Sequence, residues 1–145
     1  MNARLEPIIA QLRLEFGRHC QQDGDTTWRF EVLTSAGRSH VVTMYLKESS
    51  ADGKDLSRLV AFAPIGPVRT GISWERLLRK NAELDVGTIA IEDIWTQEHV
   101  RLPFVVFRAT HLVATVDYAE VWELVSKTGE YADQLEDTLF SRDLL

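Results

Sequence analysis

The chain has 145 residues, of which 45% are hydrophobic and 26% are charged, and this balance predicts one folded domain spanning residues 1–145. No apolar run reaches the 18 residues that suggest a membrane-spanning helix, and a single cysteine excludes an intrachain disulfide. Glu6 and Pro7 stand where a secretory signal would begin its apolar stretch, so we expect a cytoplasmic protein.

The net charge of −6 is concentrated at the C-terminal end of the chain. Residues 117–145 hold eight acids against two bases, whereas the acids and bases of the preceding residues balance. The sequence therefore has no basic footprint for nucleic acid, and its acidic segment would be repelled by an anionic membrane. We expect neither nucleic acid nor membrane as a partner, and a solvated helix face is the plain interpretation of the acidic run.

The first half of the chain predicts one helix followed by three strands. Apolar residues recur at helical spacing over residues 5–16, and Gly17 ends that stripe. Apolar and polar residues then alternate over 28–32, and two mainly apolar runs follow at 41–46 and 59–65, which predicts strands. Residues 35–38 have the composition of a hairpin turn, and residues 49–55 form a polar loop.

The second half predicts a helix, two strands and a long final helix. Ser73 is placed to cap a helix over 73–84, and the segments 86–91 and 104–112 have the composition of strands. Asp117 and Glu120 have the spacing of a capping box, which opens a helix that continues to residue 139 with Gly129 in its interior. The order α-β-β-β-α-β-β-α predicts an α+β fold in which helices flank an antiparallel sheet.

Residues that could carry catalysis or bind a metal are scattered over different predicted elements. Metal ligation requires several His, Cys or carboxylate ligands at short spacing, but this chain offers only separated candidates: His19, Cys20, His40, His99 and His111. It has neither a Gly-x-Ser-x-Gly elbow nor a Gly-Lys-Ser/Thr phosphate loop. We therefore expect no enzyme activity, no cofactor and no metal site.

Four tryptophans are the other conspicuous feature of the sequence. Trp28, Trp74 and Trp122 lie on apolar stripes and should face the core. Trp95 stands beside Ile94 in a polar connection, where it could anchor a partner or pack over a sheet edge.

The segment from Leu77 to Asp93, LLRKNAELDVGTIAIED, joins a leucine-containing helix that ends near Asn81 to an apolar strand opened by Gly87. It is followed by the apolar residues 105–107 and by an acidic helix over 120–139. Together with the order of elements, this pattern resembles the type III secretion chaperone fold, in particular the Tir chaperone (CesT-like) and YbjN-like families.

The resemblance implies a non-catalytic homodimer that binds segments of a partner protein, such as the N-terminal segment of an exported protein. It places the dimer seam around the second helix, where we name Leu77, Leu78 and Val86. This helix also carries four charged residues between 76 and 83, which leaves limited apolar surface for the seam. The candidate partner-binding surface consists of five residues, for which a place in the core is the alternative and is favoured for any single one: Leu5, Ile8, Leu12, Trp28 and Phe30.

Two other functions remain open at this point. One is a YbjN-like regulatory or stress-related domain without a role in export. The other is an enzyme or small-ligand binder, which would require a closed pocket with convergent polar groups.

Overall fold

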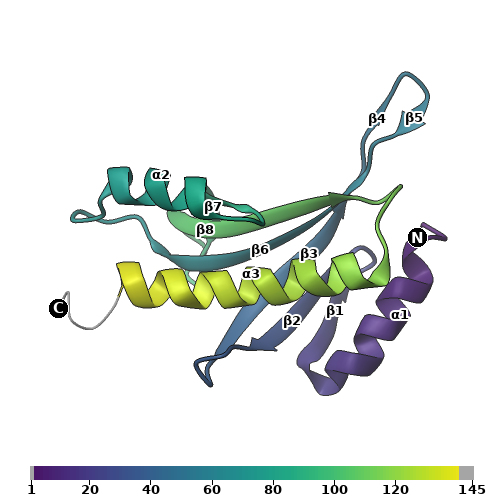
Figure 1. Ribbon diagram of the computed structural model, residues 1–145, viewed down its shortest axis with the longest axis horizontal. Helices are drawn as coiled ribbons and strands as arrows, with labels where there is room; N and C mark the ends of the chain where they lie inside the picture. Colours follow the sequence, from purple (N-terminus) through teal and green to yellow (C-terminus); the bar gives the residue numbers. More distant parts are fainter. Residues whose placement is uncertain (1, 141–145) are drawn as a thin grey trace.

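The computed structural model describes residues 2–140 and confirms the α+β class and the antiparallel sheet. The chain begins with helix α1 (Leu5–Phe16) and a short 3-10 turn η1 (Gly17–His19), and then forms strands β1 (Cys20–Gly24), β2 (Thr27–Leu33) and β3 (Ser39–Lys47). A small hairpin follows, whose strands β4 (Ser50–Ala51) and β5 (Lys54–Asp55) have two residues each, and it leads to the long strand β6 (Arg58–Pro67). Helix α2 (Trp74–Glu83), strands β7 (Thr88–Trp95) and β8 (Arg101–Leu112), and helix α3 (Tyr118–Leu139) complete the fold (Figure 1).

The main sheet has six strands in the order β1-β2-β3-β6-β8-β7, all antiparallel to their neighbours. The predicted order of elements is confirmed with two additions, the edge strand β1 and the β4–β5 hairpin within the predicted polar loop. Apolar alternation could not predict β1, because its residues are mostly polar and exposed. The segment forms a strand because its backbone pairs with that of β2.

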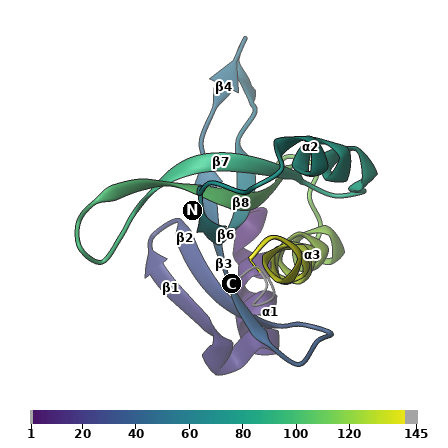
Figure 2. The same ribbon diagram turned by 90° about the vertical axis from the view of Figure 1, so that its left-hand side faces the viewer.

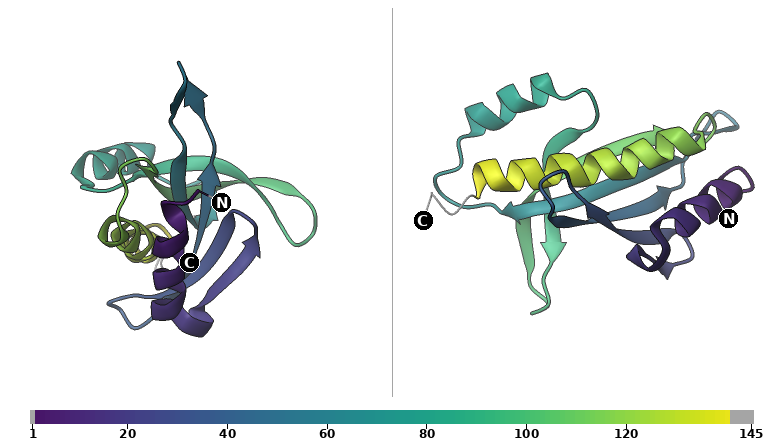
Figure 3. Two further views of the ribbon diagram at one scale, coloured as in Figure 1. Left: turned by 90° about the vertical axis from the view of Figure 1, so that its right-hand side faces the viewer. Right: turned by 60° about the horizontal axis from the view of Figure 1, so that its bottom comes forward.

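Within residues 2–140, all three α-helices lie on one face of the sheet, and the other face carries no helix (Figures 2 and 3). The register places one row of residues from neighbouring strands under the helices: Trp28 opposite Met44, Met44 opposite Ala61, and Ala61 opposite Ala109. The β7–β8 hairpin extends beyond the body of the sheet on the helix-free side (Figure 2). The core is therefore one layer, between a twisted sheet and the helices α1 and α3.

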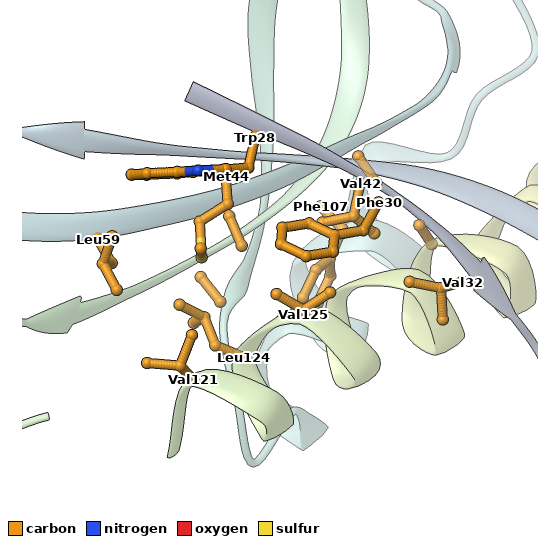
Figure 4. Packing of buried hydrophobic residues seen from close by; sticks show 14 of the residues in the cluster. Trp28, Phe30, Val32, Val42, Met44, Leu59, Phe107, Val121, Leu124 and Val125 are labelled. Carbon is orange, nitrogen blue, oxygen red and sulfur yellow. The ribbon is translucent and has the colours of Figure 1, made fainter. Parts of the chain in front are cut away.

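Helix α3 lies lengthwise across the central strands and supplies much of this core. Val125 of α3 faces Phe30 of the sheet, and Val121 and Leu124 lie nearer to Met44 (Figure 4). The predicted capping box is confirmed at the helix start, where the Glu120 N–H donates to Asp117 Oδ1 (2.8 Å) and the Asp117 N–H donates to Glu120 Oε2 (2.9 Å).

The structure corrects the proposed partner-binding surface. Each of its five residues is at most 8% exposed and belongs to the core, because α1 turns its apolar stripe inward and the even-numbered residues of β2 point to the helices: Leu5, Ile8, Leu12, Trp28 and Phe30. These side chains offer no surface to a partner in this structure.

Two of the three tryptophans expected in the core are also corrected. Trp28 is fully buried, but Trp74 is 46% exposed and Trp122 is 41% exposed. Trp74 is the first residue of α2, which covers only the edge of the sheet, and Trp122 lies on a flank of α3, where its ring packs at a tilt against Phe16.

Candidate protein-interaction surfaces

Helix α2 and strand β7 form an apolar groove at one edge of the sheet. Ser73 begins the helix as predicted, because its hydroxyl accepts the Arg76 N–H at 3.3 Å. The helix then lies over β7, and only Leu77 of its residues is buried. The groove measures about 310 Å³ and is lined almost entirely by apolar side chains: Trp74, Leu77, Leu78, Ile89, Ala90, Ile91 and Val105, with Asn81.

Exposed apolar side chains surround this groove. Leu78 is 69% exposed and Ile91 is 53% exposed, and Trp95 at the far end of β7 is 67% exposed. Isolated exposed residues of this kind are common, but a contiguous apolar patch marks an interaction surface. Trp74, Leu78 and Ile91 all line the groove and form a patch that we call the α2–β7 surface, whereas Trp95 lies outside it, at the far end of β7.

Strand β7 is an edge strand, and the Asn81 side chain closes the first part of its free edge. The Asn81 Oδ1 atom accepts the Ile89 N–H at 2.6 Å, and its Nδ2 donates to the Ile89 carbonyl oxygen at 3.1 Å. The backbone of Ile89 therefore points away from β8. Because backbone direction alternates along a strand, the N–H and C=O groups of Ile91 and Asp93 point to the same free side.

The pairing with β8 supports this assignment. Asp93 stands opposite Pro103, which has no N–H, and the Pro103 carbonyl accepts the Val68 N–H on the side away from β7. Within residues 2–140, no strand pairs with the outer side of β7. The edge thus offers unpaired donors and acceptors next to an apolar groove, the arrangement that β-strand addition uses.

The residues named for a dimer seam from the sequence fall into different positions here. Leu77 is 5% exposed and packs in the core of its own chain, and Val86 is half-buried against that core. Only Leu78 reaches the surface. Trp74 and Ile91 were not predicted as surface residues, because an apolar run such as residues 89–91 does not show which of its faces is covered.

The charges of α2 do not obstruct this surface. Arg79 Nη2 pairs with Glu75 Oε1 at 2.9 Å, and Lys80 Nζ lies 3.7 Å from Glu83 Oε2. Both pairs join residues one turn apart within the helix. Four of the five charged residues of α2 are therefore paired within the helix, and the apolar side chains remain free to contact another molecule.

A second hollow, of about 330 Å³, lies between the C-terminal end of α1, the end of β2 and helix α3. We call it the α1–α3 recess. Its apolar lining includes Phe16, Leu33 and Trp122, and its polar lining includes Glu31 and Glu130. Because the first residue of β1, Cys20, is paired with Phe30, the last residues of β2 are open on this side.

The carboxylates of the recess are held in their charged forms by neighbouring donors. A hydrogen bond from His19 is the largest cause that lowers the pKa of Glu31, whose Oε2 lies 3.4 Å from His19 Nδ1. The Ser35 hydroxyl and its N–H (3.0 Å to Oε2) both donate to Glu130 and lower the pKa of that carboxyl. Both groups are therefore negative at neutral pH.

Two buried polar side chains, Asp133 and His40, are engaged in holding the fold. Asp133 is 6% exposed and accepts two hydrogen bonds from Arg38, each 2.9 Å long, and a third from Thr34 at 3.1 Å. The Arg38 hydrogen bonds lower the pKa of Asp133. His40 places Nε2 3.0 Å from the Pro64 carbonyl oxygen, so this side of the β2–β3 hairpin is tied to β6 and α3.

The candidates for chemistry do not converge in the part of the chain that the structure describes. No three His, Cys, Asp or Glu side chains of residues 2–140 come together as metal ligands. Burial raises the pKa of Cys20, which disfavours the reactive thiolate. His111 lies on β8 with Nε2 3.5 Å from Glu120 Oε1, at the start of α3.

None of the helices within residues 2–140 is long and apolar enough to cross a membrane. No protein-family model matches the sequence, and a search of curated proteins finds no matching relative. The surfaces described above are therefore the basis for a functional proposal.

Proposed function

We propose that this protein is a non-catalytic, homodimeric, chaperone-like or adaptor module that acts in the cytoplasm and binds segments of a partner protein. The observation that carries the proposal is the α2–β7 surface, where an open strand edge runs beside an apolar groove. A surface of this kind is a liability for an isolated chain, because free edges promote association. A specific partner removes that liability by pairing with the edge.

We assign the α2–β7 surface to a second copy of the chain. Two β7 strands can pair antiparallel about a twofold axis, so that each copy offers the same patch to the other. In this arrangement Trp74 and Leu78 of each α2 cover an Ile91 side chain, which belongs either to the same chain or to the second copy. This arrangement keeps Leu78 in the seam and replaces the buried Leu77 and half-buried Val86 by the exposed residues of the surface.

Changing Leu78 to Glu tests the dimer. The substitution places a charge in the centre of the apolar seam, where its desolvation opposes association. Because Leu78 is 69% exposed within one chain, the fold of the monomer should be retained. We expect light scattering after gel filtration to give twice the 16.5 kDa chain mass for the unmodified protein and the chain mass for L78E.

Leu14 provides the matched control for this test. It is also an exposed helical leucine, with 84% of its surface free, but it lies on α1, outside the α2–β7 surface. L14E should remain dimeric. A monomeric unmodified protein, or an L78E variant with unchanged mass, contradicts the proposed seam.

The binding of partner segments is tested by capture of the tagged protein from its own cells followed by mass spectrometry. One dominant partner, held through its N-terminal segment, supports a chaperone. Recovery of the protein alone supports instead a regulatory domain similar to the YbjN-like families.

A further inference from the structure

We propose that the α1–α3 recess is the site that receives the partner segment, and that it recognises an arginine side chain next to an apolar residue. This inference deepens the proposed function by assigning the chemistry of the bound segment. The hollow has the size of a small-ligand pocket and is open on one side, so that a side chain from another polypeptide can enter it.

The charge of the recess selects a cation. Three carboxylates line it, one from each element that forms it: Glu15 from α1, Glu31 from β2 and Glu130 from α3. Among residues 2–140 none of the three forms an ion pair with a lysine or arginine. His19, beside Glu31, is the one basic residue among those that line the recess.

The aromatic lining favours a guanidinium over an ammonium group. Phe16 and Trp122 pack against each other in a tilted arrangement, with their ring centroids 5.2 Å apart, and Trp122 remains 41% exposed. A guanidinium is planar, stacks on an aromatic face and forms paired hydrogen bonds with carboxylates. An arginine can therefore lie on Trp122 while its donors reach the carboxylates around it.

The apolar part of the recess accommodates the neighbouring residue of the segment. Leu33 is 75% exposed at the end of β2, beyond the last residue that pairs with β1. Phe16 is half-buried beneath the recess and connects it to Phe30 of the core, with ring centroids 5.0 Å apart. The floor of the recess is thus continuous with the core, and Leu33 presents an apolar side chain to the solvent beside it.

The test uses short peptides as probes and the indole N–H resonance of Trp122 as the readout. The ¹⁵N-labelled full chain is titrated with acetyl-Leu-Arg-Leu-amide and with the same peptide carrying citrulline, a neutral isostere of arginine. The W122F variant assigns the resonance. We expect the arginine peptide to shift it to saturation and the citrulline peptide to bind about tenfold more weakly, because it lacks the ion pairs and the cation–π contact.

A second part of the test removes two carboxylate charges from the recess. The double variant E15Q/E31Q keeps the shape of the recess and should weaken the arginine peptide by about tenfold, whereas E48Q, in an exposed loop far along the chain, should leave binding unchanged. A Trp122 resonance that does not move, or equal affinities for the two peptides, overturns the proposal.

The outcome is separable from that of the dimer test, because the recess and the α2–β7 surface lie toward opposite edges of the sheet. The L78E variant should bind the arginine peptide as the unmodified protein does. Peptide binding by a protein that is always monomeric overturns the seam alone. A dimer that ignores the peptide overturns the recess alone.

Discussion

Replacing Gly129 by alanine should destabilise the protein, although alanine is the better helix former. A Cβ atom at position 129 would lie 2.7 Å from both Cβ and Cγ1 of Val32, where ordinary contacts are 3.4–4 Å long. The close approach involves the Val32 Cβ, which no change of rotamer can move, so α3 and β2 must separate. Overpacking of this kind costs up to about 3 kcal/mol, and the gain in helix propensity recovers about 1 kcal/mol.

The expected net loss is about 2 kcal/mol in the free energy of unfolding, which lowers the melting temperature by roughly 6 °C for a chain of this size. Thermal and urea unfolding followed by circular dichroism measure both quantities. The Q134G variant measures the effect of helix propensity alone, because Gln134 is exposed on the same helix. It should lower the free energy of unfolding by about 1 kcal/mol. A G129A variant that is more stable than the unmodified protein, by the amount that Q134G loses, would refute the packing argument.

Two further predictions concern buried polar contacts. Changing Asp133 to Asn removes the charge that pairs with Arg38 and should cost about 2 kcal/mol at pH 7. Folding lowers the pKa of Asp133, so the stabilisation by its carboxylate is fully present above the unfolded pKa of about 3.9 and is lost as the pH falls through the folded pKa. The difference in melting temperature between D133N and the unmodified protein should therefore shrink toward pH 3. A difference that is constant with pH contradicts this role. Changing Asn81 to Ala frees the backbone of Ile89 and should increase hydrogen exchange of the Ile89 amide by about tenfold, as measured by NMR; unchanged protection would show that the edge of β7 does not depend on Asn81.

Local sequence signals predicted the helices well. The apolar period over 5–16, the Ser73 cap and the Asp117–Glu120 capping box all act within a few residues, so each could be recognised without knowledge of the rest of the chain. The strands with alternating or continuous apolar residues were recognised for the same reason. Strand β1 escaped this reasoning because its polar residues are held by hydrogen bonds to β2, a partner that the local pattern does not specify.

Gly129 illustrates the limit of local reasoning. In the sequence it interrupts a helix and only weakens it, whereas in the structure it allows the helix to approach Val32, almost one hundred residues earlier in the chain. The candidate surfaces were predicted less well, since an apolar residue on a stripe can face either its own core or another molecule. Trp28 and Leu12 turned inward, and Trp74 and Trp122 remained half exposed.

The sequence by itself determined the α+β class, the order of the predicted elements and the ends of the helices, because these follow from periodicity and from contacts between near neighbours. The tertiary structure decided which apolar residues are exposed, since this depends on where each helix lies on the sheet. Helix α2 covers only an edge, so Leu78 and Ile91 stay outside, while α3 crosses the centre and buries everything beneath it. The α1–α3 recess likewise exists only where three distant segments meet, and their carboxylates become one charged site only through that packing.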